Sequence, residues 1–135
     1  MNRRTFLATS AAALTLPQLA AALQQYTPGL VDDLLADGHT VFVGFNTEWC
    51  STCAAQERVI NALKADNPAY EENITFVNVD WDQYANDELS TRLNIPRRST
   101  LVVLKGDEEL GRIVAGTSQS DIKALMDSAL TAAMA

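Results

Sequence analysis

Two cysteines three positions apart are the residues of this sequence best suited to chemistry. Cys50 and Cys53 enclose Ser51 and Thr52, and Trp49 precedes them. A strand-like apolar run ends just before this segment and a helical pattern follows it, which places Cys50 at the start of a helix. Unpaired backbone N–H groups and the helix dipole stabilise a thiolate there and lower its pKa. Cys53, one turn later, is expected to be less exposed and close enough to form a disulfide with Cys50.

This arrangement suits thiol–disulfide exchange. The thiolate of Cys50 can attack a substrate disulfide, and Cys53 can then resolve the mixed disulfide. A Cys-x-x-Cys motif alone is a modest signal, but at a strand-to-helix junction in an α/β chain it predicts a redox site. The redox-active disulfide Cys50–Cys53 is the only redox centre expected, with no other cofactor and no metal.

The elements that must position the cysteines alternate along the chain. Apolar residues at helical spacing predict helices over residues 26–37, 54–65 and 87–93. Nearly continuous apolar runs predict strands over residues 40–45, 74–80 and 100–105, and a fourth strand over 109–115 forms a hairpin with the third. Ser118 and Asp121 have the spacing of a capping box that opens a final helix. The order predicts an α/β domain with a central mixed four-stranded sheet flanked by helices.

Composition narrows the functional class further. The chain has 135 residues, 47% of them hydrophobic and 20% charged, which suits one domain of ordinary size. The formal net charge of −7 argues against nucleic-acid binding, which needs a basic face. Two cysteines and one histidine cannot complete a four-ligand zinc site from cysteine and histidine alone.

The N-terminal segment reads as an export signal. Residues 1–22 combine Arg3 and Arg4, a mildly apolar stretch and a small-residue end, the layout of a cleavable signal peptide. The paired arginines resemble the twin-arginine signal of bacteria. The stretch is too short and too polar to span a membrane. We therefore expect cleavage near Ala22, a mature domain over residues 23–135 in the periplasm, and no stable membrane insertion after signal removal.

Residues 23–135 resemble the thioredoxin family over nearly their whole length. The resemblance rests on Phe45, the run Glu48–Cys53, the strand end Asn78–Asp80, the strand and turn Thr100–Gly106, and Gly116 before the last helix. It implies a thioredoxin-like fold and a thiol–disulfide oxidoreductase with Cys50 as nucleophile and Cys53 as resolving thiol. It also implies protein thiol or disulfide substrates, a redox partner protein and a monomeric state. The family's additional N-terminal strand is not predicted, because residues 23–29 are few and polar.

Two departures concern proton transfer and redox direction. Gly44 stands where the family commonly has a buried aspartate, and Phe76 stands where it has the paired lysine. The proton of the resolving thiol must then pass to water or to Glu48. The dipeptide Ser51-Thr52 matches neither the reducing nor the oxidising members, so the direction of electron flow stays open.

A third departure lies in the loop opposite the cysteines. Ser99, directly before Thr100, stands where the family has a cis-proline. A cis peptide before a non-proline residue costs about 2.5–4 kcal/mol, so a trans or strained Arg98–Ser99 peptide is expected. The loop also carries Arg97 and Arg98, and one guanidinium, that of Arg98 above all, can stabilise the thiolate of Cys50 or bind a substrate carboxylate. The alternative is two solvated loop charges that pair with acids such as Asp87 or Glu88. The expected substrate-binding or tuning residues are Trp49, Ser51, Thr52, Arg98, Ser99 and Thr100.

Two other functions remain open at this point. The domain could be a non-catalytic thioredoxin-like binding module with a permanent disulfide. It could also hold a metal or iron–sulfur centre through the same cysteines, because the proline that keeps metals from the thiolates is missing.

Overall fold

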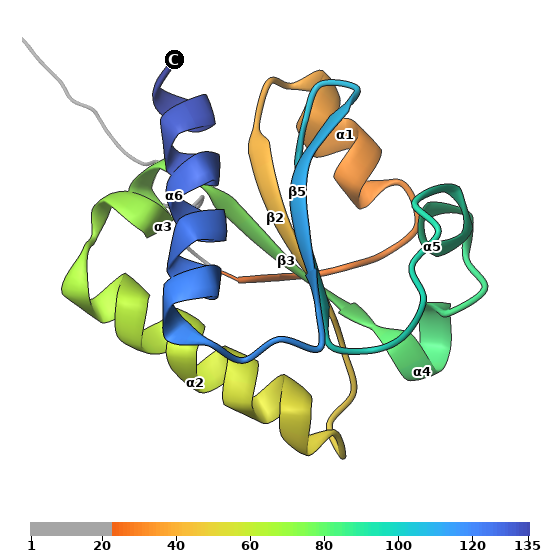
Figure 1. Ribbon diagram of the computed structural model, residues 1–135. Helices are drawn as coiled ribbons and strands as arrows, with labels where there is room; N and C mark the ends of the chain where they lie inside the picture. Colours follow the sequence, from red (N-terminus) through yellow and green to blue (C-terminus); the bar gives the residue numbers. More distant parts are fainter. Residues whose placement is uncertain (1–22) are drawn as a thin grey trace, which may run out of the picture.

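A five-stranded mixed sheet forms the centre of the protein (Figure 1). The computed structural model describes residues 23–135; the predicted signal peptide, residues 1–22, lies outside them. The strand order is β1-β3-β2-β4-β5. The strands β1, β3 and β2 are mutually parallel, and β4 runs antiparallel to both of its neighbours, β2 and β5. The strands are β1 (Gln24–Gln25), β2 (Thr40–Asn46), β3 (Thr75–Asp80), β4 (Thr100–Lys105) and β5 (Glu108–Val114).

Helices cover both faces of the sheet, as Figure 1 shows. One face carries α2 (Ser51–Asp66), α3 (Ala69–Asn73) and α6 (Gln119–Met134). The other carries α1 (Leu30–Ala36), α4 (Trp81–Tyr84) and α5 (Glu88–Arg92). Side chains alternate across the sheet, so Phe42 and Phe76 join the core under α2 and α6, while Val43 and Val77 join the core under α1 and α5. Burial on both faces explains the continuous apolar runs of the central strands.

The mixed sheet flanked by helices is confirmed, but the prediction of four strands is wrong. The additional strand β1 pairs in parallel with β3, at Gln24–Val77 and Gln25–Asn78. The pairing uses backbone groups, so the polar glutamine side chains gave no signal for it. The short helices α3 and α4 were not predicted either, because a single turn shows little periodicity. Within residues 23–135, no helix is long and apolar enough to cross a membrane.

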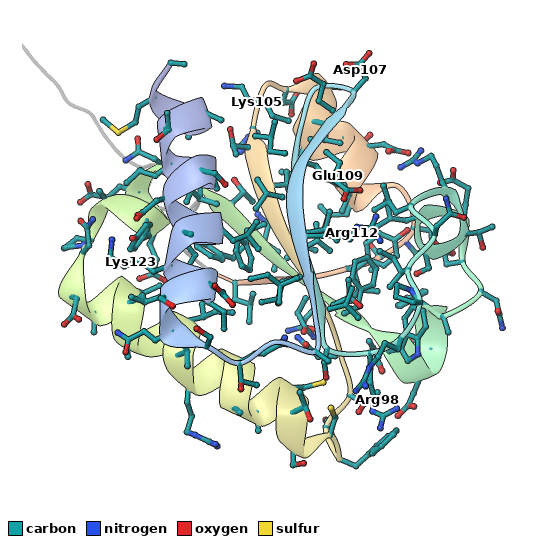
Figure 2. The ribbon with its side chains drawn as sticks, in the orientation of Figure 1. Arg98, Lys105, Asp107, Glu109, Arg112 and Lys123 are labelled. Atoms are coloured by element: carbon teal, nitrogen blue, oxygen red, sulfur yellow. The ribbon has the colours of Figure 1, made fainter. Side chains whose placement is uncertain are left out.

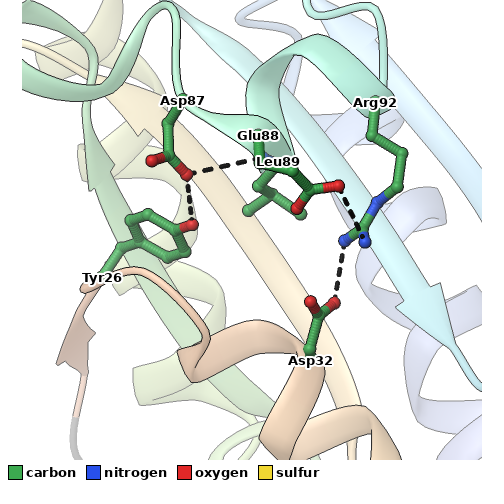
Figure 3. A network of polar contacts seen from close by, with 6 residues as sticks. All are labelled: Tyr26, Asp32, Asp87, Glu88, Leu89 and Arg92. Carbon is green, nitrogen blue, oxygen red and sulfur yellow. Dashed lines mark hydrogen bonds and ion pairs between the residues drawn. The ribbon is translucent and has the colours of Figure 1, made fainter.

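A polar network fastens the start of the domain to α5, the helix that precedes the Ser99 loop (Figure 3). The hydroxyl of Tyr26 donates to Asp87 at 2.5 Å, and Asp87 also caps α5 by accepting from the backbone N–H of Leu89. Arg92 at the end of α5 pairs with Asp32 of α1 at 2.8 Å. The exposed ion pair contributes little, whereas the buried tyrosine fixes the position of α5.

Candidate active site

The two cysteines lie at the start of α2, shortly after the end of β2. Cys50 is the N-cap residue, and its sulfur accepts a hydrogen bond from the backbone N–H of Cys53 at 3.1 Å. The sulfur therefore takes the place of the oxygen that usually caps a helix. Both cysteines are reduced, and each is 5% exposed. The expectation that Cys50 is the more exposed of the two is therefore wrong.

The hydroxyl of Ser99 bridges the two sulfur atoms. Its Oγ lies 3.1 Å from the sulfur of Cys50 and 3.0 Å from that of Cys53. Ser99 is completely buried, and its backbone N–H donates to the carbonyl of Phe45 at 2.7 Å. The structure thus places Ser99 opposite the cysteines, as the resemblance to the family implies.

The backbone at Ser99 differs from that of a proline loop. No peptide bond within residues 23–135 is cis, so the Arg98–Ser99 peptide is trans, as expected. Ser99 has φ 65°, in the left-handed region that few residues other than glycine adopt. The loop therefore reaches the cysteines through a strained residue with a trans bond.

These contacts shift the pKa of each thiol in opposite directions. Burial disfavours the thiolate of Cys50, but hydrogen bonds from the Cys53 thiol, the Ser99 hydroxyl and the Cys53 backbone outweigh it and, with the Arg98 guanidinium, lower the pKa to about 6. Burial and the neighbouring Cys50 raise the pKa of Cys53, against smaller opposing contributions from Ser99 and the Thr47 backbone. The pair therefore holds one thiolate and one thiol near neutral pH.

Arg98 and Trp49 form the surface beside Cys50. Figure 2 shows Arg98 at the end of the molecule where α2 begins. Its guanidinium carbon lies 4.4 Å from the centre of the Trp49 ring, a cation–π contact. The Trp49 indole N–H donates to Asp82 at 2.9 Å, and the side chain is 62% exposed. In the described part of the chain, neither Arg97 nor Arg98 forms an ion pair, so the pairing alternative is wrong.

The other predicted residues lie near the cysteines without contacting their sulfurs through a hydrogen bond. Ser51 is exposed and Thr52 half-buried in the first turn of α2. Thr100 is buried in β4, and its hydroxyl donates to the carbonyl of Arg97 at 2.7 Å. This hydrogen bond links the start of β4 to the loop that carries Arg97, Arg98 and Ser99. Glu48 is exposed.

A cleft of about 310 Å³ lies between α2 and the sheet and reaches Cys53. Gly44 lines it, and a Cβ at that position would approach Asn46 Nδ2 at 3.1 Å. Asn46 in turn donates to Asn78 of β3. The position of the family's buried acid therefore has two amides beside it, and the cleft is also lined by Phe76 and by the charged residues Glu48, Glu57, Lys64 and Asp80.

Gln56 is a site residue that the sequence analysis missed. It is 1% exposed, and its amide nitrogen donates to the carbonyls of Ser99 and Gly116, both at 2.9 Å. The signal was present in the sequence: Gln56 and Cys53 continue the helical stripe that ends at Ile60 and Leu63. A polar residue on such a buried stripe needs a partner, which here is the active-site loop.

Comparisons with known proteins agree with this geometry. The Thioredoxin family model matches residues 23–128. The chain belongs to the thioredoxin family. Thioredoxin H5 of rice (Oryza sativa subsp. japonica) is 27% identical over 89 residues, which cover 66% of this chain and 62% of the rice protein.

Solved structures show the same fold. Trxlp from Edwardsiella tarda superposes with a TM-score of 0.66 at 25% identity, covering 77% of this chain and 98% of that one. Thioredoxin from Malassezia sympodialis gives a TM-score of 0.68 at 20% identity, covering 80% and 93% of the two chains. This family member thus keeps the cysteine pair and the fold, and carries a serine between the sulfurs.

Proposed function

We propose that the protein is an exported thiol–disulfide oxidoreductase that exchanges disulfides with protein thiols through Cys50 and Cys53. The observation that carries the proposal is the pair of reduced sulfurs at the start of α2, with Cys50 as N-cap and a pKa of about 6. A thiolate at neutral pH is the nucleophile that exchange requires.

The reaction runs in two exchanges. The Cys50 thiolate attacks one sulfur of the substrate disulfide, a mixed disulfide forms, and the other substrate sulfur leaves as a thiolate. Cys53 then attacks the Cys50 sulfur, closing the protein disulfide and releasing the second substrate thiol. Two electrons pass from the protein to the substrate, and the reverse sequence oxidises a substrate dithiol. The disulfide itself is the redox centre, with no other cofactor.

The surface of Trp49 and Arg98 suits a protein substrate. The exposed indole offers a flat apolar contact beside the nucleophile, and the guanidinium offers charge to a substrate carboxylate. Arg98 Nε is buried and has no hydrogen-bond partner within residues 23–135. Both side chains would bind substrate, and Ser51, Thr52 and Thr100 would tune or support the site. We propose that the protein acts as a monomer.

The decisive experiment measures turnover and reduction potential together. Reduced protein should convert a protein disulfide such as that of insulin to thiols, and Cys50→Ser should abolish the reaction. A reduction potential near about −270 mV identifies a reductant, and one near about −120 mV an oxidant. No turnover in either direction would refute the proposal in favour of a binding module. Iron or zinc in freshly purified protein would instead favour the metal-binding alternative.

Export is proposed from the sequence of residues 1–22. The twin-arginine layout supports delivery to the periplasm with cleavage near Ala22. Fractionation of a tagged chain tests it: the mature protein should appear in the periplasm, and replacing Arg3 and Arg4 with lysine should retain the full chain in the cytoplasm. Retention of the unchanged chain in the cytoplasm would refute export, and export of the lysine variant would refute the twin-arginine route.

A further inference from the structure

Two buried polar atoms in the cleft that reaches the cysteines lack hydrogen-bond partners within residues 23–135. They are the hydroxyl oxygen of Thr47 and the amide oxygen of Gln56. Thr47 is 7% exposed and Gln56 is 1% exposed. Buried polar groups are almost always paired with protein groups or with a small bound molecule such as water, because an unpaired one costs free energy. The two atoms therefore mark a place for a small polar molecule.

The same cleft gives a small molecule access to both cysteines. Its volume is about 310 Å³, and Cys50 and Cys53 line it together with Thr47 and Gln56. Gly44 also lines it, without a side chain that would fill it. Each cysteine is only 5% exposed, so a reactant of few atoms can approach the sulfurs through the cleft more readily than a bulky one.

A hydroperoxide matches both the unpaired atoms and the thiols. Its O–H can donate to the amide oxygen of Gln56, and its oxygen atoms can accept from the hydroxyl of Thr47. Peroxides oxidise accessible thiolates of low pKa, above all those that have a second cysteine beside them. Cys50 fits this description, because its pKa is about 6 and the hydroxyl of Ser99 lies 3.1 Å from its sulfur.

We propose that the protein has a second activity, the reduction of small hydroperoxides at Cys50, with the substrate bound in the cleft by Thr47 and Gln56. This activity goes beyond disulfide exchange with proteins, because its oxidant is a peroxide. Its substrate also enters through the cleft rather than across the surface of Trp49 and Arg98. The Thr47 hydroxyl is a binding group that disulfide exchange does not use.

The first step oxidises Cys50. Its thiolate attacks the terminal oxygen of the hydroperoxide, and the O–O bond breaks with its electron pair on the other oxygen. That oxygen accepts a hydrogen bond from Thr47 and a proton from solvent, and it leaves as an alcohol, or as water when the substrate is hydrogen peroxide. Cys50 becomes a sulfenic acid.

The second step forms the protein disulfide. The sulfur of Cys53 attacks the sulfur of the sulfenic acid, and the hydroxyl leaves on the opposite side with the electron pair of the S–O bond. This hydroxide and the proton that Cys53 releases make up one water molecule. An external dithiol then returns the disulfide to two thiols by exchange, which completes the cycle. Two electrons pass from the dithiol to the peroxide in each turn.

The test compares the folded protein with its own unfolded chain. Hydrogen peroxide is mixed with the reduced protein, the reaction is stopped with an alkylating agent, and intact mass gives the oxidised fraction. Each rate is divided by the thiolate fraction at that pH, taken from an alkylation titration. The folded protein should react about tenfold or more faster per thiolate than the chain in denaturant, because the cleft positions the peroxide and donates to the departing oxygen. In Cys53→Ser, dimedone, which traps sulfenic acids, should label Cys50.

Variants of Thr47 isolate the binding group. Thr47→Val keeps the shape of the side chain and removes the hydroxyl, so oxidation by hydrogen peroxide should slow about tenfold or more, the cost of one hydrogen bond to a developing charge. Its alkylation by iodoacetamide should keep the unmodified rate, since that reaction needs no donor in the cleft. Thr47→Ser retains the hydroxyl and should keep the peroxide rate. Thr91→Val, at an exposed threonine of α5, is the matched control and should change neither rate.

The results that would overturn the proposal are distinct. One is a folded protein that reacts with hydrogen peroxide no faster per thiolate than the unfolded chain. Another is peroxide consumption, in the presence of dithiothreitol, that persists in Cys50→Ser. An unchanged peroxide rate in Thr47→Val, or equal slowing of oxidation and alkylation, would remove Thr47 as the binding group. Reduction of insulin involves no peroxide, so a failure of the proposed function would show in that assay and not in this one.

Discussion

The hydrogen bond from Ser99 to Cys50 predicts a measurable change in acidity. The hydroxyl lies 3.1 Å from a sulfur whose pKa is about 6, so Ser99→Ala removes a donor to a thiolate. Hydrogen bonds to charged groups contribute about 1.5–3 kcal/mol, and one pKa unit corresponds to about 1.4 kcal/mol. The pKa of Cys50 should therefore rise by about 1–2 units in the variant, because the charged form loses its donor.

The rate of alkylation against pH reads this shift directly. At pH 7 the thiolate fraction should fall from about 90% to between about 50% and 10%, which slows alkylation about two- to ninefold. At high pH the two proteins should react at similar rates. Ser120→Ala, at an exposed serine of α6, is the matched control and should leave the midpoint unchanged. An unchanged midpoint in Ser99→Ala would refute the assignment of Ser99 as a stabilising donor.

Four further predictions concern Arg98, the two cysteines, Tyr26 and Ser99. Arg98→Met should raise the pKa of Cys50 by less than about one unit in the same titration, since part-exposed charges contribute about 0.2–1 kcal/mol; an unchanged pKa would remove Arg98 from the mechanism. Cys53→Ser should accumulate a mixed disulfide, visible by intact mass, whereas Cys50→Ser should form none; the reverse would exchange their roles. Tyr26→Phe should lower the free energy of unfolding in urea by about 1–2 kcal/mol, because a carboxylate loses its buried donor; no loss would show that the network contributes little. Ser99→Pro should lower the free energy of unfolding by more than about 1 kcal/mol, because proline does not adopt the observed φ and lacks the N–H that bonds to Phe45. An equally stable variant would contradict the importance of the loop geometry.

The sheet and the cysteine pair were predictable from the sequence because each has a local signature. The strand Thr100–Lys105 was predicted at its observed bounds, since all its residues except Lys105 are apolar or β-branched, on both faces. Cys50 was placed correctly at the start of a helix, because a strand pattern and a helix pattern meet there. Both signals depend on neighbouring residues in the chain.

What the sequence analysis missed depends on contacts between distant segments. Cys50 was expected to be the more exposed cysteine, but the Ser99 loop, 49 residues away in sequence, covers its sulfur. The strand β1 forms through backbone pairing with β3, which no side-chain pattern encodes. Gln56 is buried because it bonds to two carbonyls from other elements. All three are contacts between segments distant in sequence, and they involve polar residues or a strand too short to show a pattern.

The loop at Ser99 has a different backbone from the one that a proline at this position would give. Proline fixes φ near −65° and lacks an N–H, whereas Ser99 has φ 65° and donates its N–H to the carbonyl of Phe45. A single change to proline would therefore break a buried hydrogen bond and require a different backbone. The side-chain amide of Gln56 and the backbone N–H of Ala115 both donate to the Ser99 carbonyl. Ala115 itself has a positive φ. A proline at position 99 would keep the carbonyl that accepts these hydrogen bonds, but it would remove the N–H that donates to Phe45 and the hydroxyl between the sulfurs.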